Sequence, residues 1–119
     1  MKIKYANEKV AQQCTNMKAA AKLFGGNKAL AVSLLSRINA MKAADVIKDI
    51  IVQPQFRFHN LHGNREGLFA VDVKTKRDQW RIILYPLDEN EEKFNPCHID
   101  KICAIVKIVE IEEVSAHYE

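Results

Sequence analysis

Two histidines and an arginine gather around one short glycine loop, and their side chains could do acid–base chemistry on a phosphate. His59 and His62 lie beside the loop Gly63–Gly67, which carries Arg65. Imidazole titrates near neutral pH and can take or give a proton. Guanidinium binds phosphate through two parallel hydrogen bonds, and glycine lets the backbone come close. The plainer alternatives are structural or exposed histidines and an arginine that stabilises the loop through an ion pair.

A second arginine lies in a predicted strand, Trp80–Tyr85. Alternation puts Trp80 and Ile82 on one face of that strand, and Arg81 and Tyr85 on the other. If a groove lies on the second face, the Arg81 guanidinium can stabilise the charge on a phosphate. The alternative is a surface arginine on a half-exposed strand, and Tyr85 fits either a core or a binding role.

His117 and Tyr118 are the last candidates along the chain. They could supply an acid or stack on an unpaired base. The alternative is a frayed end, since only Glu119 follows. The other large aromatic residues have strand spacing and are expected in the core rather than on a base: Phe56, Phe58, Phe69 and Trp80.

The cysteines predict no metal centre. Cys14, Cys97 and Cys103 are odd in number and show no CxxC spacing, whereas structural zinc takes four closely spaced ligands. A site at Cys97-His98 with Cys103 is the weaker alternative to ordinary thiols. No cofactor is expected.

Charge is distributed unevenly along the 119 residues. Residues 1–55 carry nine Lys/Arg and three Asp/Glu, residues 56–85 carry six and three, and residues 86–119 carry three and nine. The first two-thirds could therefore present a basic face to a polyanion, or the lysines could simply keep the protein in solution. The length predicts a single domain over residues 1–119, and without a signal peptide or membrane span we expect a cytoplasmic protein.

Two helices are expected before the strands. One runs from about Glu8 to Phe24 behind an Asn7 cap and ends at Gly25-Gly26. The next starts after an Asn27 cap, and Val46–Ile51 either continues it or forms a short separate helix that ends at Pro54.

Strands fill most of the rest of the chain. Ile3–Tyr5 is a possible short strand, and further strands are expected at Phe56–Leu61, Leu68–Val73, Trp80–Tyr85 (ended by Pro86) and Ile102–Ile111. The expected fold class is α+β, with an N-terminal helix hairpin packed on a small antiparallel β-sheet.

Three segments carry a resemblance to a known family. Phe58–Gly67 reads F-H-N-L-H-G-N-R-E-G, followed by an aromatic strand; Trp80-Arg81-Ile82 follows; and the chain closes with Val109–Tyr118. This order resembles the RelE/ParE superfamily of type II toxins, especially its HigB-like "plasmid maintenance killer" branch. His62 and Asn64 replace a lysine and an aspartate of the family pattern, and Ala116-His117-Tyr118 replaces its closing D-Y-H.

The resemblance implies a RelE-like fold and a toxin that cleaves mRNA in the ribosomal A site. The 2′-hydroxyl attacks the adjacent phosphate without a metal, and the site residues would be Arg81, Arg65, His59, His62, His117 and Tyr118. The implied partner is a HigA-like helix-turn-helix antitoxin, in a hetero-oligomer. Two alternatives stay open: a ParE-like gyrase inhibitor that cuts nothing, and an inactive homologue that only binds its antitoxin.

Overall fold

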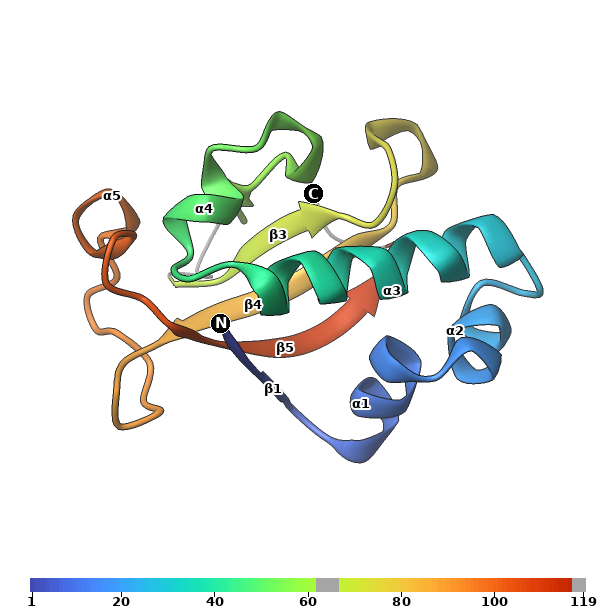
Figure 1. The fold of residues 1–119 in the computed structure, drawn as a ribbon, viewed down its shortest axis with the longest axis horizontal. Helices are drawn as coiled ribbons and strands as arrows, with labels where there is room; N and C mark the ends of the chain where they lie inside the picture. The colour runs from blue at the N-terminus through green and yellow to red at the C-terminus, as the bar shows by residue number, and fades with distance from the viewer. Residues whose placement is uncertain (62–66, 117–119) are drawn as a thin grey trace.

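A computed structural model describes residues 1–61 and 67–116 of the chain, and they form an α+β fold (Figure 1). The α-helices within these residues are α1 (Glu8–Thr15), α2 (Met17–Leu23), α3 (Lys28–Ala43), α4 (Lys48–Ile51) and α5 (Ile99–Ile102). The strands are β1 (Lys2–Tyr5), β2 (His59–Asn60), β3 (Phe69–Asp72), β4 (Arg81–Leu87) and β5 (Ile108–Ser115). None of these helices is long and apolar enough to cross a membrane in the described part of the chain.

The strands form one sheet in the order β1-β5-β4-β3-β2. Neighbours from β5 to β2 run antiparallel, but β1 and β5 run parallel, with Ile3 opposite Val109. The sheet is therefore mixed, and the expected purely antiparallel sheet is wrong. Parallel strands need a long crossover connection between them, and the chain from β1 to β5 contains helices and the other three strands.

The N-terminal helices form where asparagine side chains cap them. Asn7 and Asn27 accept hydrogen bonds from the amides of Val10 and Leu30 at 3.0 and 3.1 Å, which confirms both expected caps. The single helix expected over residues 8–24 is wrong. Asn16 adopts an extended conformation and caps a new helix by accepting from the Ala19 amide, so α1 and α2 are separate.

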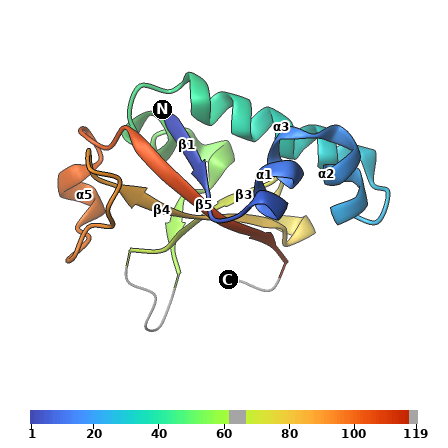
Figure 2. The ribbon, with the colours of Figure 1, turned by 90° about the horizontal axis from the view of Figure 1, so that it is seen from below.

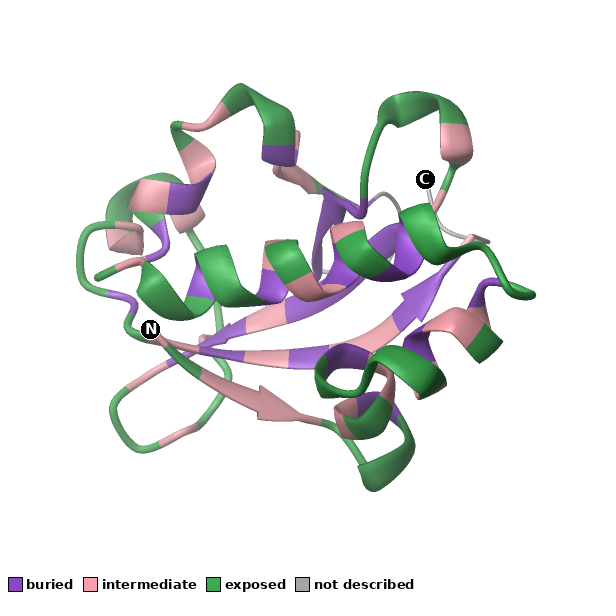
Figure 3. Ribbon diagram, turned by 45° about the vertical axis from the view of Figure 1, so that its right-hand side comes forward, coloured by how far each residue is buried: buried purple, intermediate pink, exposed green. Residues whose placement is uncertain are grey.

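Helix α3 covers one face of the sheet. Its buried residues lie on one side of the helix and make one stripe: Leu30, Ala31, Leu34, Ile38 and Met41. In Figure 3 this buried stripe faces the strands, while the outer side of α3 is exposed. The strands contribute Val71, Ile82, Leu84, Val109 and Ile111 to the same core. The expected core aromatic residues lie there too, with Phe24 edge-on to Trp80 at 4.8 Å between ring centroids.

Of the two alternatives left open for residues 46–51, the separate short helix is the one observed, as α4. Two segments near the strands differ from expectation. β4 does not end before Pro86 but continues to Leu87. Proline lacks an N–H to donate to a neighbouring strand, but β3 pairs with β4 only as far as Leu84, so no β3 residue needs that donor. Residues 102–107 are not strand, because an apolar run alone does not distinguish helix from strand. The carbonyls of Cys103 and Val106 instead accept the amides of Lys48 and Ile47, which ties this segment to α4.

Tyr5 gives a test of the core beneath β1. Its hydroxyl is buried and has no hydrogen-bond partner among the described residues, and burial raises the pKa of Tyr5 above its usual value. Burying an unpaired hydroxyl costs roughly 1–3 kcal/mol. We predict that Tyr5→Phe leaves the free energy of unfolding unchanged or raises it by about 1 kcal/mol in a urea titration. A loss of stability of that size would mean that the hydroxyl does have a partner.

Candidate active site

The sheet has a second face, which α1, α2 and α3 leave uncovered; all three lie on the other side (Figure 2). We call it the uncovered face. Strand register assigns its residues, because directly opposed residues point the same way. One row across the sheet is His59, Ala70, Ile83 and Glu113, and the next is Asp72, Arg81 and Ser115.

A small apolar cluster occupies part of the uncovered face. It consists of Leu61, Leu68, Ala70 and Ile83, with Tyr85 packed against it. Arg81, Ile83 and Tyr85 thus share a face opposite Trp80 and Ile82, as the alternation predicted. Tyr85 is half-buried, and the Lys93 ammonium lies over its ring, 3.8 Å from the centroid.

Asp72 is the centre of a charged cluster beside these apolar residues. The Arg57 Nε donates to both oxygens of the carboxylate, each at 3.1 Å, and the Arg81 Nε lies 3.2 Å from one of them. Arg37 on α3 binds the backbone of the same residue, with its Nε donating to the Asp72 carbonyl at 3.1 Å. Asp72 thus contacts three arginines from three parts of the chain, two through its carboxylate and one through its backbone carbonyl.

The cluster and the turn next to it are positively charged. The guanidinium groups of Arg57 and Arg81 share the Asp72 carboxylate, and Asp78 lies 4.0 Å from Arg81 Nη1. A third guanidinium, that of Arg37, donates to backbone carbonyls, so among the described residues the cluster holds three cations and two carboxylates. The adjoining turn adds three exposed cations: Lys74, Lys76 and Arg77. A polyanion would be attracted to this region.

Arg81 is buried rather than open to a groove, with 1% of its surface exposed. Besides Asp72, its guanidinium donates to the carbonyls of Trp80 at 2.8 Å and Lys76 at 3.1 Å. This burial also excludes the alternative of a surface arginine. The sequence pattern gives the face of a residue correctly but not its exposure, and Asp72 on the neighbouring strand is what allows this arginine to be buried.

His59 lies in β2 at the edge of the sheet and is half-buried. Its Nδ1 lies 2.7 Å from the backbone carbonyl of Arg57. Since a carbonyl only accepts hydrogen bonds, Nδ1 carries the proton in the neutral ring, and Nε2 is the basic nitrogen. A histidine held in this tautomer can accept a proton at Nε2.

The other predicted site residues, Arg65, His62, His117 and Tyr118, lie outside the described residues. Of the six, His59 and Arg81 fall within them, in strands that both pair with β3. Arg57 links the two. It donates to Asp72, which Arg81 also contacts, and its own carbonyl contacts His59.

Arg57, Asp72 and Arg37 were not predicted from the sequence as members of this cluster. One signal was present: Asp72 stands inside the otherwise apolar stretch Leu68–Val73, and a carboxylate inside a buried strand needs cationic partners. Sequence spacing could not show which arginines these are. Arg37 and Arg57 lie 35 and 15 residues before Asp72, and Arg81 lies 9 residues after it.

No group of three side chains that could hold a metal ion occurs within residues 1–61 and 67–116. The cysteines there, Cys14, Cys97 and Cys103, form no disulfide. Burial raises the pKa of Cys14 to about 12, so this thiol stays protonated and unreactive at neutral pH.

In comparison with known proteins, no family model and no curated protein sequence matches the chain. A functional assignment therefore depends on the geometry of the site and on the sequence pattern.

The Asp72 cluster makes a strong stability prediction. Asp72→Ala removes the nearest carboxylate from the buried Arg81 guanidinium, and removing one partner of a buried ion pair costs about 3–5 kcal/mol. We expect a loss of that size in the free energy of unfolding from a urea titration. Asp45→Ala is the control, because Asp45 is exposed and its loss should change stability by less than about 0.5 kcal/mol.

The double variant Asp72→Ala/Arg81→Met should recover part of the loss, since it also removes the buried guanidinium from which Asp72→Ala takes the nearest carboxylate. Equal losses for Asp72→Ala and Asp45→Ala would show that the carboxylate does not hold the cluster.

Proposed function

We propose that this protein is a toxin of the RelE/HigB-like type with a RelE-like fold. It would be a cytoplasmic, metal-independent endoribonuclease that cuts mRNA in the ribosomal A site, bound and silenced by a HigA-like helix-turn-helix antitoxin in a hetero-oligomer. The observation that carries the proposal is the grouping of His59, Arg57 and the Asp72–Arg81 pair on the uncovered face of the sheet.

The order of elements supports the same proposal. The helices α1 to α4 precede the strands that carry the segments resembling the toxin family.

The chemistry assigns different tasks to the residues of this face. The Nε2 of His59 would take the proton from the attacking 2′-hydroxyl. Arg57, with about a third of its side chain exposed, would bind the phosphate and stabilise the charge that develops on it. Arg81 would act through Asp72 as a positioning residue, because its guanidinium is buried. Arg65, His62, His117 and Tyr118 remain candidates for the acid that protonates the leaving oxygen and for further phosphate contacts.

One observation favours a second candidate function. The burial of Arg81 removes the cation that the resemblance puts in direct contact with phosphate. A homologue that keeps the fold and binds its antitoxin, or inhibits gyrase as ParE-like toxins do, would tolerate that change.

The test is primer-extension mapping of a defined mRNA on translating ribosomes. We predict new A-site cuts with the wild-type protein. His59→Asn keeps a side-chain N–H that can donate to the Arg57 carbonyl but removes the basic Nε2, so the cutting rate should fall by about 10²–10⁴-fold. Arg57→Met should lower it by roughly 10²–10³-fold through lost stabilisation of the phosphate.

The matched control is Lys18→Met, which removes an exposed cation on α2, away from the uncovered face. It should cut at the wild-type rate. Intact mRNA with a folded wild-type protein that still arrests growth would reject the nuclease and favour the gyrase-inhibitor alternative, which a supercoiling assay then tests. If the protein neither cuts mRNA nor arrests growth, the inactive homologue is the better description.

A further inference from the structure

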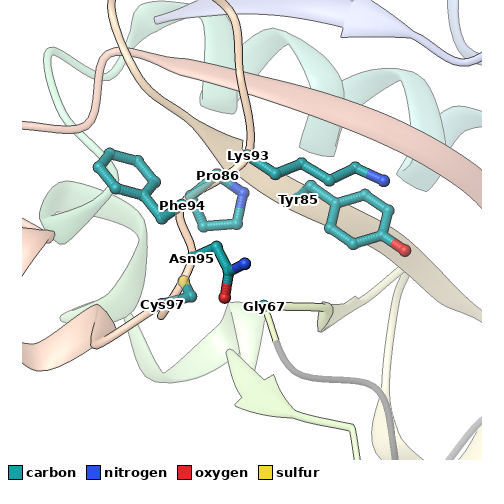
Figure 4. Close-up of a pocket in the computed structure, with 7 residues that line it drawn as sticks. All are labelled: Gly67, Tyr85, Pro86, Lys93, Phe94, Asn95 and Cys97. Carbon is teal, nitrogen blue, oxygen red and sulfur yellow. The ribbon is translucent and has the colours of Figure 1, made fainter.

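A pocket of about 240 Å³ opens beside Tyr85, next to the candidate active site. Its lining comes from the start of β3, from β4 and from the segment that follows β4: Gly67, Tyr85, Pro86, Lys93, Phe94, Asn95 and Cys97. Figure 4 shows the Asn95 amide pointing between Gly67 and Tyr85, with the Pro86 ring behind it. The volume is below the roughly 300–1,000 Å³ of pockets for drug-sized ligands, so it suits one small planar group.

The pocket is held in shape by contacts between its two sides. The backbone of Lys93 forms an isolated antiparallel β-bridge with Leu87 at the end of β4. This bridge fixes the segment that follows β4 against the sheet. On the other side, Gly67 lies so close to Cys97 that an added Cβ would be 3.4 Å from the Cys97 Cβ. The walls are thus built into the fold on both sides of Tyr85.

The side chains of this pocket combine a ring, an amide and a cation. Tyr85 offers an aromatic face and is half-buried, while the Asn95 amide is exposed and can both donate and accept hydrogen bonds. Lys93 lies over the Tyr85 ring and is itself exposed. An exposed cation–π contact is weaker than the stacking of a base on an aromatic ring, so a base can displace the ammonium, which then reaches a phosphate.

We propose that this pocket binds one unpaired adenine of an RNA strand. Stacking on Tyr85 would hold the base, and the Asn95 amide would read its edge, because asparagine pairs with the N6 and N7 of adenine through two hydrogen bonds. That the adenine belongs to the cut mRNA rests on the proposed nuclease function.

The position of the pocket fits a neighbouring nucleotide of the same strand. Tyr85 lies two residues from Ile83, and Ile83 is in the same row as His59, two strands away. With about 3.4 Å per residue and ~4.8 Å between strands, the two backbone positions are roughly 12 Å apart. The pocket would thus select which phosphate meets His59 and Arg57.

Binding can be tested without cleavage by using 2′-O-methyl tetranucleotides, whose 2′-oxygen cannot attack. We would titrate the four homotetramers (A, C, G and U) into the ¹⁵N-labelled protein and follow the Asn95 side-chain amide and the Gly67 backbone amide by NMR. The adenine tetramer should shift both signals and bind most tightly. Asn95→Ala should lose the preference for adenine by roughly 5- to 150-fold, while Asn90→Ala, which changes an exposed asparagine of the preceding turn, should keep it.

Equal binding of all four tetramers to the wild type, no binding, or shifts confined to other residues would each overturn the adenine pocket. The two proposals fail separately. If the protein cuts mRNA through His59 but Asn95→Ala changes neither binding nor cut sites, the pocket is rejected and the nuclease stands. If the adenine tetramer binds at Asn95 but mRNA stays intact on ribosomes, the pocket stands and the nuclease is rejected.

Discussion

The carboxylate of Asp72 is the group on which the uncovered face of the sheet depends. It is nearly fully buried, and a buried carboxylate is stable only with cationic partners. Arg57 and Arg81 supply them from two directions, and Arg37 fixes the backbone of the same residue from α3. The Arg57 backbone in turn orients His59. The helix layer, the sheet and the candidate catalytic groups are therefore joined through one residue.

This arrangement divides the arginines by role. A buried guanidinium with carboxylate and carbonyl partners, such as Arg81, holds a structure in place. Arg57 shares the carboxylate but keeps part of its side chain exposed, so it can also meet a ligand. A carboxylate shared in this way orients the exposed arginine before substrate arrives, and an oriented cation stabilises a developing charge better than a mobile one.

Much of the fold could be predicted from local chemistry. Asparagine caps at Asn7 and Asn27, the apolar stripe of α3 and the alternation of Trp80–Tyr85 all depend on near neighbours in sequence, and all are observed. The break at Asn16 and the parallel pairing of β1 with β5 were not predicted. Apolar residues keep helical spacing in the sequence on both sides of Asn16, and strand direction depends on distant segments. In the site, the face of Arg81 followed from alternation, but its burial depends on Asp72, and the tautomer of His59 depends on a carbonyl two residues away.

In the proposed reaction, His59 and Arg57 act on RNA through the substrate's own 2′-hydroxyl. The most direct measurement of this compares two ribosome-bound mRNAs that differ at one nucleotide, with either a ribose or a 2′-deoxyribose just before the mapped cut. We predict cleavage of the ribose substrate, ending in a 2′,3′-cyclic phosphate, and no cleavage at that position of the deoxy substrate. Cleavage of both substrates at equal rates, or of neither, would contradict a reaction through the 2′-hydroxyl.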